Sequence, residues 1–500
     1  MKTFLVLLLL VSGTPCFASD LTGNWVVREA LGDGTFRATY LDLHQEGERI
    51  TGTIRVTQFY YKIVESTGGP DGFTLSGSMM DGGSERRVKY EGKLQGEELH
   101  VATRRRGNTE LVEMVAHRAP AGEGAYPARR PLPELHRVAD NGLARTPPMG
   151  WNSWNKFAGR VDDAAVRGMA DAMASNGMKE AGYQYINIDD TWEAGRDEHG
   201  NITTNKKFPD MKALADYVHS KGLKIGIYSS PGPDTCAGYE GSYGHEEQDA
   251  KTYAAWGIDY LKYDWCGARN LYSDEEMRAV YQMMGDALLK AGRPILYSLC
   301  QYGRADVWKW GADVGGNAWR TTGDIRDAWD SMSKIGFGQD ELAAWAAPGH
   351  WNDPDMLEIG NGGMSDDEYR THMSLWSILA APLLAGNDLR NMTPAILAIL
   401  TNREVIAINQ DKGGKQGRRI WKSGEQEIWA RPLSDGGQAI GIFNRGVTAA
   451  KVSVRWPAIG WTTAPKSGRD LWAHREVTFS GEEYSASVPA HGVVLVRIAR

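Results

Sequence analysis

Carboxylate side chains follow several apolar, strand-like runs in the middle of the chain. Asp189 and Asp190 follow one run directly, Asp264 ends a second, and Asp324 lies just after a third. An isolated Asp in a turn is usually a cap or turn former, but carboxylates held close together repel one another, which costs free energy unless function requires them. No CxxC or HExxH motif accompanies them, so we expect neither a metal site nor a cofactor. Paired carboxylates without a metal signature indicate glycoside hydrolysis, in which one group attacks the sugar and the other donates a proton.

The elements that must position these side chains are helices that each end at a glycine and lead into an apolar strand. Apolar residues at helical spacing predict helices over residues 163–176 and 211–221, and a further helix is expected over 249–256. Ser273 and Glu276 form a capping-box pattern, which predicts a helix over 273–291. The strands that follow start roughly 35–40 residues apart, which is the length of a βα unit and predicts a parallel α/β architecture. A doubly wound sheet is the alternative to a (β/α)8 TIM barrel. No GxGxxG or P-loop follows a strand, and acidic residues gather at the strand ends, so we expect the barrel, with its active site at those ends.

The rest of the chain predicts two β domains on either side of this barrel. Residues 142–415 are about the right length for eight βα units. Short β-rich runs between glycine turns predict an N-terminal all-β domain over 19–118, followed by a Pro-rich linker over 119–141. A C-terminal antiparallel β-sandwich is expected over 416–500. Because 19–118 contains no candidate catalytic residue, we expect an accessory domain that small substrates do not need.

The composition is that of a globular chain with more than one domain. Its 500 residues are too many for a single core, and 42% are hydrophobic while 24% are charged. The net charge of −7 argues against a nucleic-acid partner and against an acidic membrane surface. The 18 Trp and 20 Tyr fit either large cores or aromatic platforms for a sugar, and composition alone does not choose between them.

Residues 1–18 have the pattern of a secretory signal peptide. Lys2 gives the positive start, an apolar run covers 4–11, and Cys16 and Ala18 place small residues before a cleavage site after Ala18. A lipoprotein anchor at Cys16 is the alternative, although Pro15 before it fits that pattern poorly. No later segment has 18 unbroken apolar residues, so we expect no membrane span and a secreted or periplasmic protein.

Cleavage of this peptide would leave three cysteines, Cys236, Cys266 and Cys300. In an oxidising compartment one pair is expected to form a disulfide, with the third a buried thiol. Their spacing alone does not select the pair.

A series of motifs in fixed order covers the predicted barrel. The motifs are PMGWNSW (148–154), IDDTW (188–192), KIGIY (224–228), LKYDWC (261–266), WRTTGDI (319–325), WNDPDM (351–356), APLL (381–384) and VIAINQD (405–411). In these motifs residues 143–416 resemble glycoside hydrolase family 27, the family of α-galactosidases and α-N-acetylgalactosaminidases. The chain looks like a bacterial-type member with an extra N-terminal β domain, which the resemblance does not cover.

The resemblance implies a role for each matching residue. Asp264 would be the nucleophile and Asp324 the acid/base, whose proton the charge of Asp264 would help to retain. Asp189 and Asp190 would bind the O4 and O6 hydroxyls of galactose, and the resemblance also pairs Cys236 with Cys266 in a disulfide. The full set of implied substrate-binding residues is Trp154, Asp189, Asp190, Tyr228, Lys262, Gln301, Arg320 and Met356. In that set Lys262 and Arg320 would donate to sugar hydroxyls and keep nearby carboxylates ionised, while Trp154 would wall the sugar.

Some positions depart from the family pattern, and others bear on which sugar is bound. The chain has Gln301-Tyr302 where the family often has Glu-Trp, and a Gln there disfavours an N-acetylgalactosamine substrate, whose acetamido group needs small residues. Asp190 leaves room for the CH2OH group of galactose, which a longer Glu would fill. Thr191 replaces a family Cys, so one family disulfide is missing.

We therefore expect a retaining exo-α-galactosidase that works by metal-independent double displacement on α-galactoside oligosaccharides or polysaccharides. A β-L-arabinopyranosidase or an α-N-acetylgalactosaminidase on the same scaffold is the first alternative. A non-catalytic carbohydrate-binding protein is the second, and it predicts loss of Asp264 or Asp324, both of which are present. The sequence leaves the natural aglycone and the oligomeric state open.

Overall fold

The computed structural model describes residues 20–81, 84–104, 110–120, 122–461 and 464–499. The predicted signal peptide lies outside these residues. The chain forms two compact units: one contains residues 1–30 and 36–126, and the other contains 31–35 and 127–500. None of the helices in the described ranges is both long and apolar enough to cross a membrane.

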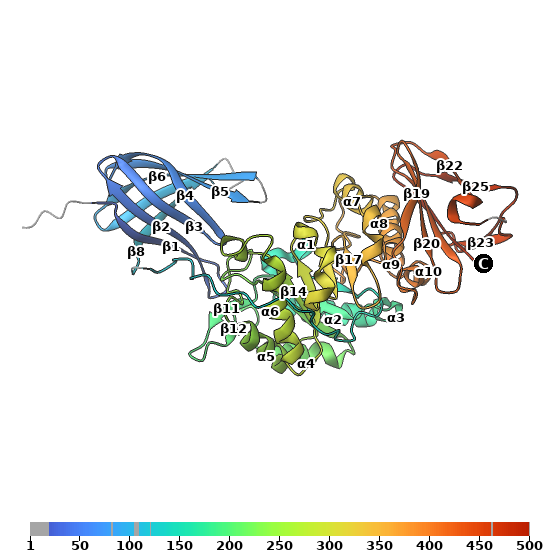
Figure 1. The fold of residues 1–500 in the computed structure, drawn as a ribbon, viewed down its shortest axis with the longest axis horizontal. Coiled ribbons are helices and arrows are strands. Elements are labelled where there is room, and N and C mark those ends of the chain that lie inside the picture. The colour runs from blue at the N-terminus through green and yellow to red at the C-terminus, as the bar shows by residue number, and fades with distance from the viewer. Residues whose placement is uncertain (1–19, 82–83, 105–109, 121, 462–463, 500) are drawn as a thin grey trace, which may run out of the picture. The chain divides into compact units, whose positions relative to one another are not determined.

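The first unit is a closed antiparallel β-barrel (Figure 1). Its strands are β1 (Gly23–Ala30), β2 (Phe36–Glu46), β3 (Arg49–Val56), β4 (Phe59–Gly69), β5 (Gly72–Asp81), β6 (Ser84–Gln95), β7 (Glu98–Arg104) and β8 (Leu111–Arg118). Each strand pairs with the next, and β1 also pairs with β8, which closes the barrel. Alternate side chains such as Trp25, Leu41 and Leu75 fill its interior, as the period of two in a strand requires. The predicted N-terminal all-β domain is confirmed.

The second unit contains a parallel eight-stranded sheet that curls into a (β/α)8 barrel, which confirms the predicted fold class. Its strands are β9 (Met149–Asn152), β10 (Tyr185–Asn187), β13 (Lys224–Ser229), β14 (Tyr260–Asp264), β15 (Leu296–Cys300), β16 (Ala318–Arg320), β17 (Trp351–Asp353) and β18 (Leu383–Ala385). They follow one another around the sheet, with β18 beside β9. A parallel bridge between Leu357, just after β17, and Ala385 of β18 joins the two remaining ends.

Helices lie between successive strands and pack their apolar faces against the sheet. The main ones are α2 (Asp163–Ser175), α4 (Met211–Ser220), α5 (Glu246–Trp256), α6 (Met277–Lys290), α7 (Trp329–Gly336), α8 (Asp366–Ile378), α9 (Pro394–Leu400) and α10 (Arg403–Asn409). In α2 the buried residues are Val166, Met169, Ala170 and Met173, the four that the helical spacing selects. The side chain of Asp162 accepts a hydrogen bond from the Ala165 amide and so caps the start of α2.

The segment between the two barrels contains no helix or strand in its described residues from 127 to 148. Val138 is nonetheless buried, and its amide donates to the Asp313 carbonyl. The side chain of Gln282 on α6 accepts a hydrogen bond from the His136 amide. The predicted linker therefore packs along the (β/α)8 barrel over its second half.

The chain ends in a small antiparallel β domain, as predicted. One sheet contains β19 (Arg418–Ser423), β20 (Gln426–Pro432), β21 (Gln438–Asn444), β26 (Val493–Ile498), β23 (Ser467–Asp470) and β24 (Arg475–Thr478), in that order. A second sheet pairs β22 (Ala450–Arg455) with β25 (Glu483–Val488). Ile442, Val454, Trp456 and Val488 lie in the core that the two sheets share.

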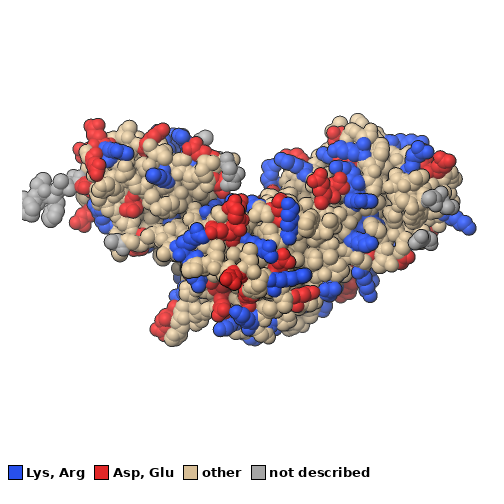
Figure 2. All heavy atoms as spheres, in the orientation of Figure 1, with Lys and Arg blue, Asp and Glu red and all other residues tan. Residues whose placement is uncertain are grey.

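On the face shown in Figure 2, basic and acidic side chains are interspersed. This distribution accompanies a net charge of −7 spread over 500 residues. A mixed surface of this kind gives solubility without a strong field of one sign.

Candidate active site

The expected nucleophile, Asp264, is the last residue of β14 and is buried. Its backbone lies in register with Cys300 at the end of β15, so the two side chains stand at the same level of the barrel. The Tyr228 hydroxyl on β13 donates a hydrogen bond of 3.1 Å to Oδ2 of Asp264. Oδ1 is buried and makes no hydrogen bond to another described residue. One carboxylate oxygen is thus held in place while the other is left for a ligand.

Lys262 lies two residues before Asp264 on the same face of β14, as the period of two requires. Its Nζ donates a 2.8 Å hydrogen bond to Oδ2 of Asp189, which also accepts one from Nδ2 of Asn152. Burial raises the pKa of Asp264, and the positive charge of Lys262 opposes this rise. The predicted role of Lys262 in favouring the anion therefore has a physical basis, although its direct partner is Asp189.

Asp190 is buried beside this pair, and one of its oxygens has a backbone partner. The Ala237 amide donates a 2.8 Å hydrogen bond to Oδ2, while Oδ1 has none among the described residues. Burial raises the pKa of Asp190 to about 7. A buried, half-satisfied carboxyl is costly unless a ligand completes its hydrogen bonds.

The expected acid/base, Asp324, follows β16 and differs sharply from Asp264 in exposure. Its side chain is 70% exposed, whereas the Arg320 side chain is 4% exposed. Arg320 donates a 3.0 Å hydrogen bond to Oδ1 of Asp324 and lies 2.9 Å from Oδ2 of Asp355. The buried guanidinium therefore joins the exposed carboxylate to the barrel, and the negative charge of Asp324 contributes to the raised pKa of Asp264.

The other predicted residues also follow barrel strands. Trp154 comes just after β9 and is partly exposed, and Met356 follows β17 and is buried. Gln301 follows β15, is fully buried, and donates from Nε2 to the Arg320 carbonyl at 3.1 Å. Its Oε1 has no partner among the described residues. The structure thus links Asp189, Asp190, Tyr228, Lys262, Asp264, Gln301, Arg320 and Asp324 by hydrogen bonds or charge. Trp154 and Met356 lie after two other strands of the same barrel.

Two residues of the site were not predicted. Tyr302 places its hydroxyl 3.7 Å from Sγ of Cys236, the Arg320 guanidinium lies 5.7 Å from its ring centre, and burial together with the charge of Asp264 raises its pKa well above the usual range. Its φ of +63° is rare for a residue other than glycine, and no sequence signal predicts it. Asp355 is part of the WNDPDM motif, so the sequence could have indicated it as a site residue. Its ion pair with Arg320 is visible only in the structure.

Comparisons with known proteins agree with this geometry. A family model described as alpha galactosidase A matches residues 146–411, and one described as the alpha galactosidase C-terminal beta sandwich domain matches 423–498. An alpha-galactosidase of Cyamopsis tetragonoloba is 50% identical over 359 residues, which cover 71% of this chain and 86% of that protein. The chain belongs to glycoside hydrolase family 27, the α-galactosidase family.

Two further family 27 relatives extend the comparison. Alpha-galactosidase A of Cellvibrio japonicus is 48% identical over 381 residues, covering 71% of this chain and 93% of its own. The crystal structure of alpha-galactosidase I from Mortierella vinacea matches with a TM-score of 0.69 and 38% identity, covering 72% of this chain and 98% of its own. The family resemblance that the sequence motifs indicated is therefore confirmed.

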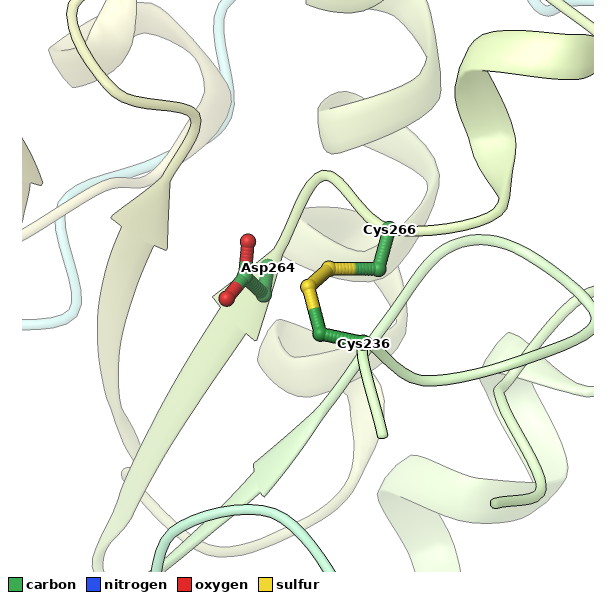
Figure 3. Close-up of side chains that lie close together, drawn as sticks. All are labelled: Cys236, Asp264 and Cys266. Carbon is green, nitrogen blue, oxygen red and sulfur yellow. A yellow bond between two sulfur atoms is a disulfide. The ribbon is translucent and has the colours of Figure 1, made fainter. Parts of the chain in front are cut away.

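The disulfide expected from the family resemblance, Cys236–Cys266, is present next to Asp264, the expected nucleophile (Figure 3). It joins the loop after β13 to the loop after β14, and Cys300 is a buried free thiol. Sγ of both cysteines and a carboxylate oxygen of Asp264 all lie within 4.8 Å of one another. The bond therefore fixes the two loops that flank the end of β14.

Loss of this disulfide is expected to lower the stability of the protein. Replacing Cys236 and Cys266 together by Ser should lower the free energy of unfolding by about 2–4 kcal/mol, because the 30-residue loop regains its freedom in the unfolded chain. Denaturant unfolding of the double variant, compared with wild type in the presence and absence of a reductant, measures this effect. If peptide mapping of the unreduced protein found both thiols free, the expectation would be wrong.

Buried carboxyls in this barrel are expected to make the free protein less stable above neutral pH. Burial raises the pKa of Asp190 and Glu358 to about 7 and that of Asp353 to about 6, from ordinary values near 4. The native state then holds these protons more tightly than the unfolded chain does, so their stabilising contribution is complete below about pH 4 and is lost progressively as pH rises through the folded pKa values of about 6 and 7. The melting temperature should be lower at pH 8 than at pH 6 by a few degrees.

A pair of variants isolates this effect. Asp190→Asn removes one of the three titrating groups, so the difference in melting temperature between pH 6 and pH 8 should shrink. Asp216→Asn changes an exposed carboxylate on α4 and should leave the difference unchanged. A wild-type protein whose melting temperature rises over this interval would contradict the assignment.

Proposed function

We propose that the protein is a retaining exo-α-galactosidase, which releases terminal α-linked D-galactose from oligosaccharides or polysaccharides by double displacement. The observation that carries this proposal is the contrast between Asp264, buried and held by one oxygen, and Asp324, exposed beside Arg320. Membership of the α-galactosidase family and relatives at about 50% identity support hydrolysis of α-galactosides rather than the alternatives.

The two carboxyls suit the two halves of the reaction. Asp264 attacks the anomeric carbon with its free Oδ1 and forms a covalent galactosyl-enzyme, while Asp324 gives its proton to the departing glycosidic oxygen. Asp324 then takes a proton from a water that attacks the same carbon, which releases Asp264 and galactose. The exposure of Asp324 lets both the leaving group and the incoming water reach it.

Buried polar atoms supply the preference for galactose, and two of them, Oδ1 of Asp190 and Oε1 of Gln301, have no hydrogen-bond partner among the described residues. In this proposal Oδ1 of Asp190 and Nζ of Lys262 bind the O4 and O6 side of the sugar, and Oε1 of Gln301 accepts from the hydroxyl at position 2. Gln301 is fully buried, and its side chain is larger than the small residues that would admit an acetamido group. Arg320 holds Asp324, and Trp154, Tyr228 and Met356 wall the sugar.

Kinetics on three nitrophenyl glycosides test the proposal. The α-D-galactopyranoside should have a kcat/KM well above those of the β-L-arabinopyranoside and the α-N-acetylgalactosaminide. Proton NMR of the first-formed product should show α-galactose, since double displacement retains configuration. If β-galactose appeared first, the double displacement would be wrong and the roles of the two Asp residues would have to be reassigned.

We also propose that the protein is exported from the cytoplasm. Residues 1–18 support it by their composition, because they combine a basic start with an apolar run and a small-residue cleavage site. We expect N-terminal sequencing of the mature protein, from the medium or the periplasm, to begin at Ser19. A full-length cytoplasmic product would contradict this.

A further inference from the structure

The segment Leu31–Thr35 connects β1 to β2 in sequence but belongs to the compact unit that contains residues 127–500. Asp33 in this segment is only 5% exposed. It lies far from every candidate catalytic residue in sequence, and the proposed reaction assigns it no role.

Asp33 accepts hydrogen bonds from several residues of the second unit, the unit that contains the (β/α)8 barrel. The Tyr239 hydroxyl donates a 2.7 Å hydrogen bond to Oδ2 of Asp33, and Lys207 Nζ lies 3.7 Å from the same oxygen. Nδ2 of Asn205 donates to it at 3.5 Å, and the Asp33 carbonyl accepts from the Lys206 amide at 3.0 Å. Burial opposes ionisation of Asp33, but hydrogen bonds from Thr35 and Tyr239 outweigh burial and lower its pKa.

One path leads from Asp33 through Tyr239 to Asp190. Tyr239 belongs to a tight turn, in which the Thr235 amide donates to the Tyr239 carbonyl at 2.9 Å and the Thr235 hydroxyl accepts from the Tyr239 amide at 3.0 Å. Between these two residues, the Ala237 amide donates the 2.8 Å hydrogen bond to Oδ2 of Asp190. The bond from Tyr239 to Asp33 therefore holds the turn that positions Asp190.

A second path leads from Asp33 to Thr191, the residue directly after Asp190. Lys207 Nζ donates to Oγ1 of Thr191 at 2.8 Å, and Nδ2 of Asn205 donates to the Thr191 carbonyl at 2.9 Å. Thr191 has a φ of +87°, a conformation that a β-branched residue adopts only when its surroundings impose it. Both of the groups that hold Thr191 also contact Asp33.

We propose that Asp33 is a positioning residue for Asp190, and that through it the segment Leu31–Thr35 sets the preference for a sugar that carries a CH2OH group. This inference rests on the proposed function, in which Asp190 binds the O4 and O6 side of galactose. One path holds the carboxylate of Asp190, and the other holds Thr191, the residue directly after it. Because a displacement of about 1 Å can cost about 100-fold in rate, losing the shared anchor matters although Asp33 touches no substrate.

If Asp33 positions Asp190, residues 19–118 are needed for full discrimination between small substrates, contrary to the expectation from the sequence. A chain without them lacks Asp33, so Tyr239 and Lys207 would lose this carboxylate. Such a chain would keep all the candidate catalytic residues and still discriminate poorly between galactose and a pentose of the same configuration.

The test compares two sugars that differ only in the CH2OH group. Asp33→Ala should lower the ratio of kcat/KM for nitrophenyl α-D-galactopyranoside to that for nitrophenyl β-L-arabinopyranoside by about 10-fold or more. Calorimetric titration should show a weaker Kd for D-galactose and a nearly unchanged Kd for L-arabinose. A variant that is merely less stable would lower both activities equally and leave the ratio unchanged. Asp71→Asn, an exposed turn residue, is the matched control and should have the wild-type ratio.

A second variant keeps the test decisive if Asp33→Ala fails to fold. Tyr239→Phe removes only the hydroxyl that donates to Asp33 and should lower the ratio in the same direction. If the folded variant kept the wild-type ratio and both Kd values, the positioning role would be wrong while the proposed function stood. If the wild type neither hydrolysed the galactoside nor bound galactose, the proposed function would fail and this inference with it.

Discussion

Replacing Asp264 by Asn is expected to abolish turnover of every α-galactoside, with kcat lower by roughly 10,000-fold or more. Asn has nearly the same shape, so Tyr228 can still donate to the side-chain oxygen at this position. An amide is a poor nucleophile, however, and no covalent galactosyl-enzyme can form. The reaction then loses its covalent route, and the barrier to glycosidic cleavage rises.

Measurement of this effect needs a fold control and a binding control. Circular dichroism should be unchanged in Asp264→Asn, and galactose should still bind, because Asp189, Asp190 and Lys262 remain in place. Intact mass spectrometry after rapid mixing with an activated galactoside should detect a galactosyl adduct in the wild type and none in the variant. Asp216→Asn on α4 should retain full activity. If the variant kept an activity within 100-fold of wild type, Asp264 would not be the nucleophile.

The second large effect is expected at Asp324 and depends on the leaving group. Asp324→Asn removes the proton donor, so galactosides with poorly acidic leaving groups, including natural oligosaccharides, should lose roughly 100- to 10,000-fold in kcat/KM. Nitrophenyl galactosides should lose far less, because their leaving groups depart without protonation. Deglycosylation also loses its base, so the covalent intermediate should accumulate and give a burst of nitrophenol.

A series of aryl galactosides with leaving groups of graded acidity measures this directly. The plot of log kcat/KM against leaving-group pKa should be steeper for Asp324→Asn than for the wild type. Asp330→Asn, an exposed carboxylate at the start of α7, is the matched control and should keep the wild-type slope. Equal slopes for Asp324→Asn and the wild type would show that another group donates the proton.

Much of the catalytic barrel was predictable because its signals are local. The apolar spacing in α2 and α4 selects the residues that are buried there, and the glycines after them lead into the predicted strands. The positions of Asp190 and Asp264 followed from the same reasoning, since parallel strands bring their carboxyl ends to one face.

Other features depend on contacts that no local pattern encodes. The Ser273–Glu276 capping signal predicted a helix from residue 273, whereas α6 begins at Met277. The Ser273 amide does donate to the Glu276 carboxylate, but Arg129 pairs with the same carboxylate and residues 274–276 form a turn. Asp33 is a stronger case, because its partners Lys207 and Tyr239 are far away in the chain and its importance is visible only once the fold is known.

The closed N-terminal barrel also bears on how the chain avoids association with its own copies. An unpaired strand edge is a template on which another chain can add a strand, and closure of β1 onto β8 leaves no edge strand among the described strands of this barrel. The larger C-terminal sheet is open and ends at β19 and β24, and both strands begin with charged residues, Arg418 and Arg419 in one and Arg475 and Glu476 in the other. Charges on an edge disfavour the pairing of one sheet with another. The two β domains thus limit edge-to-edge pairing in different ways. The first closes its described strands into a barrel, and the larger sheet of the second has charged residues on its edge strands.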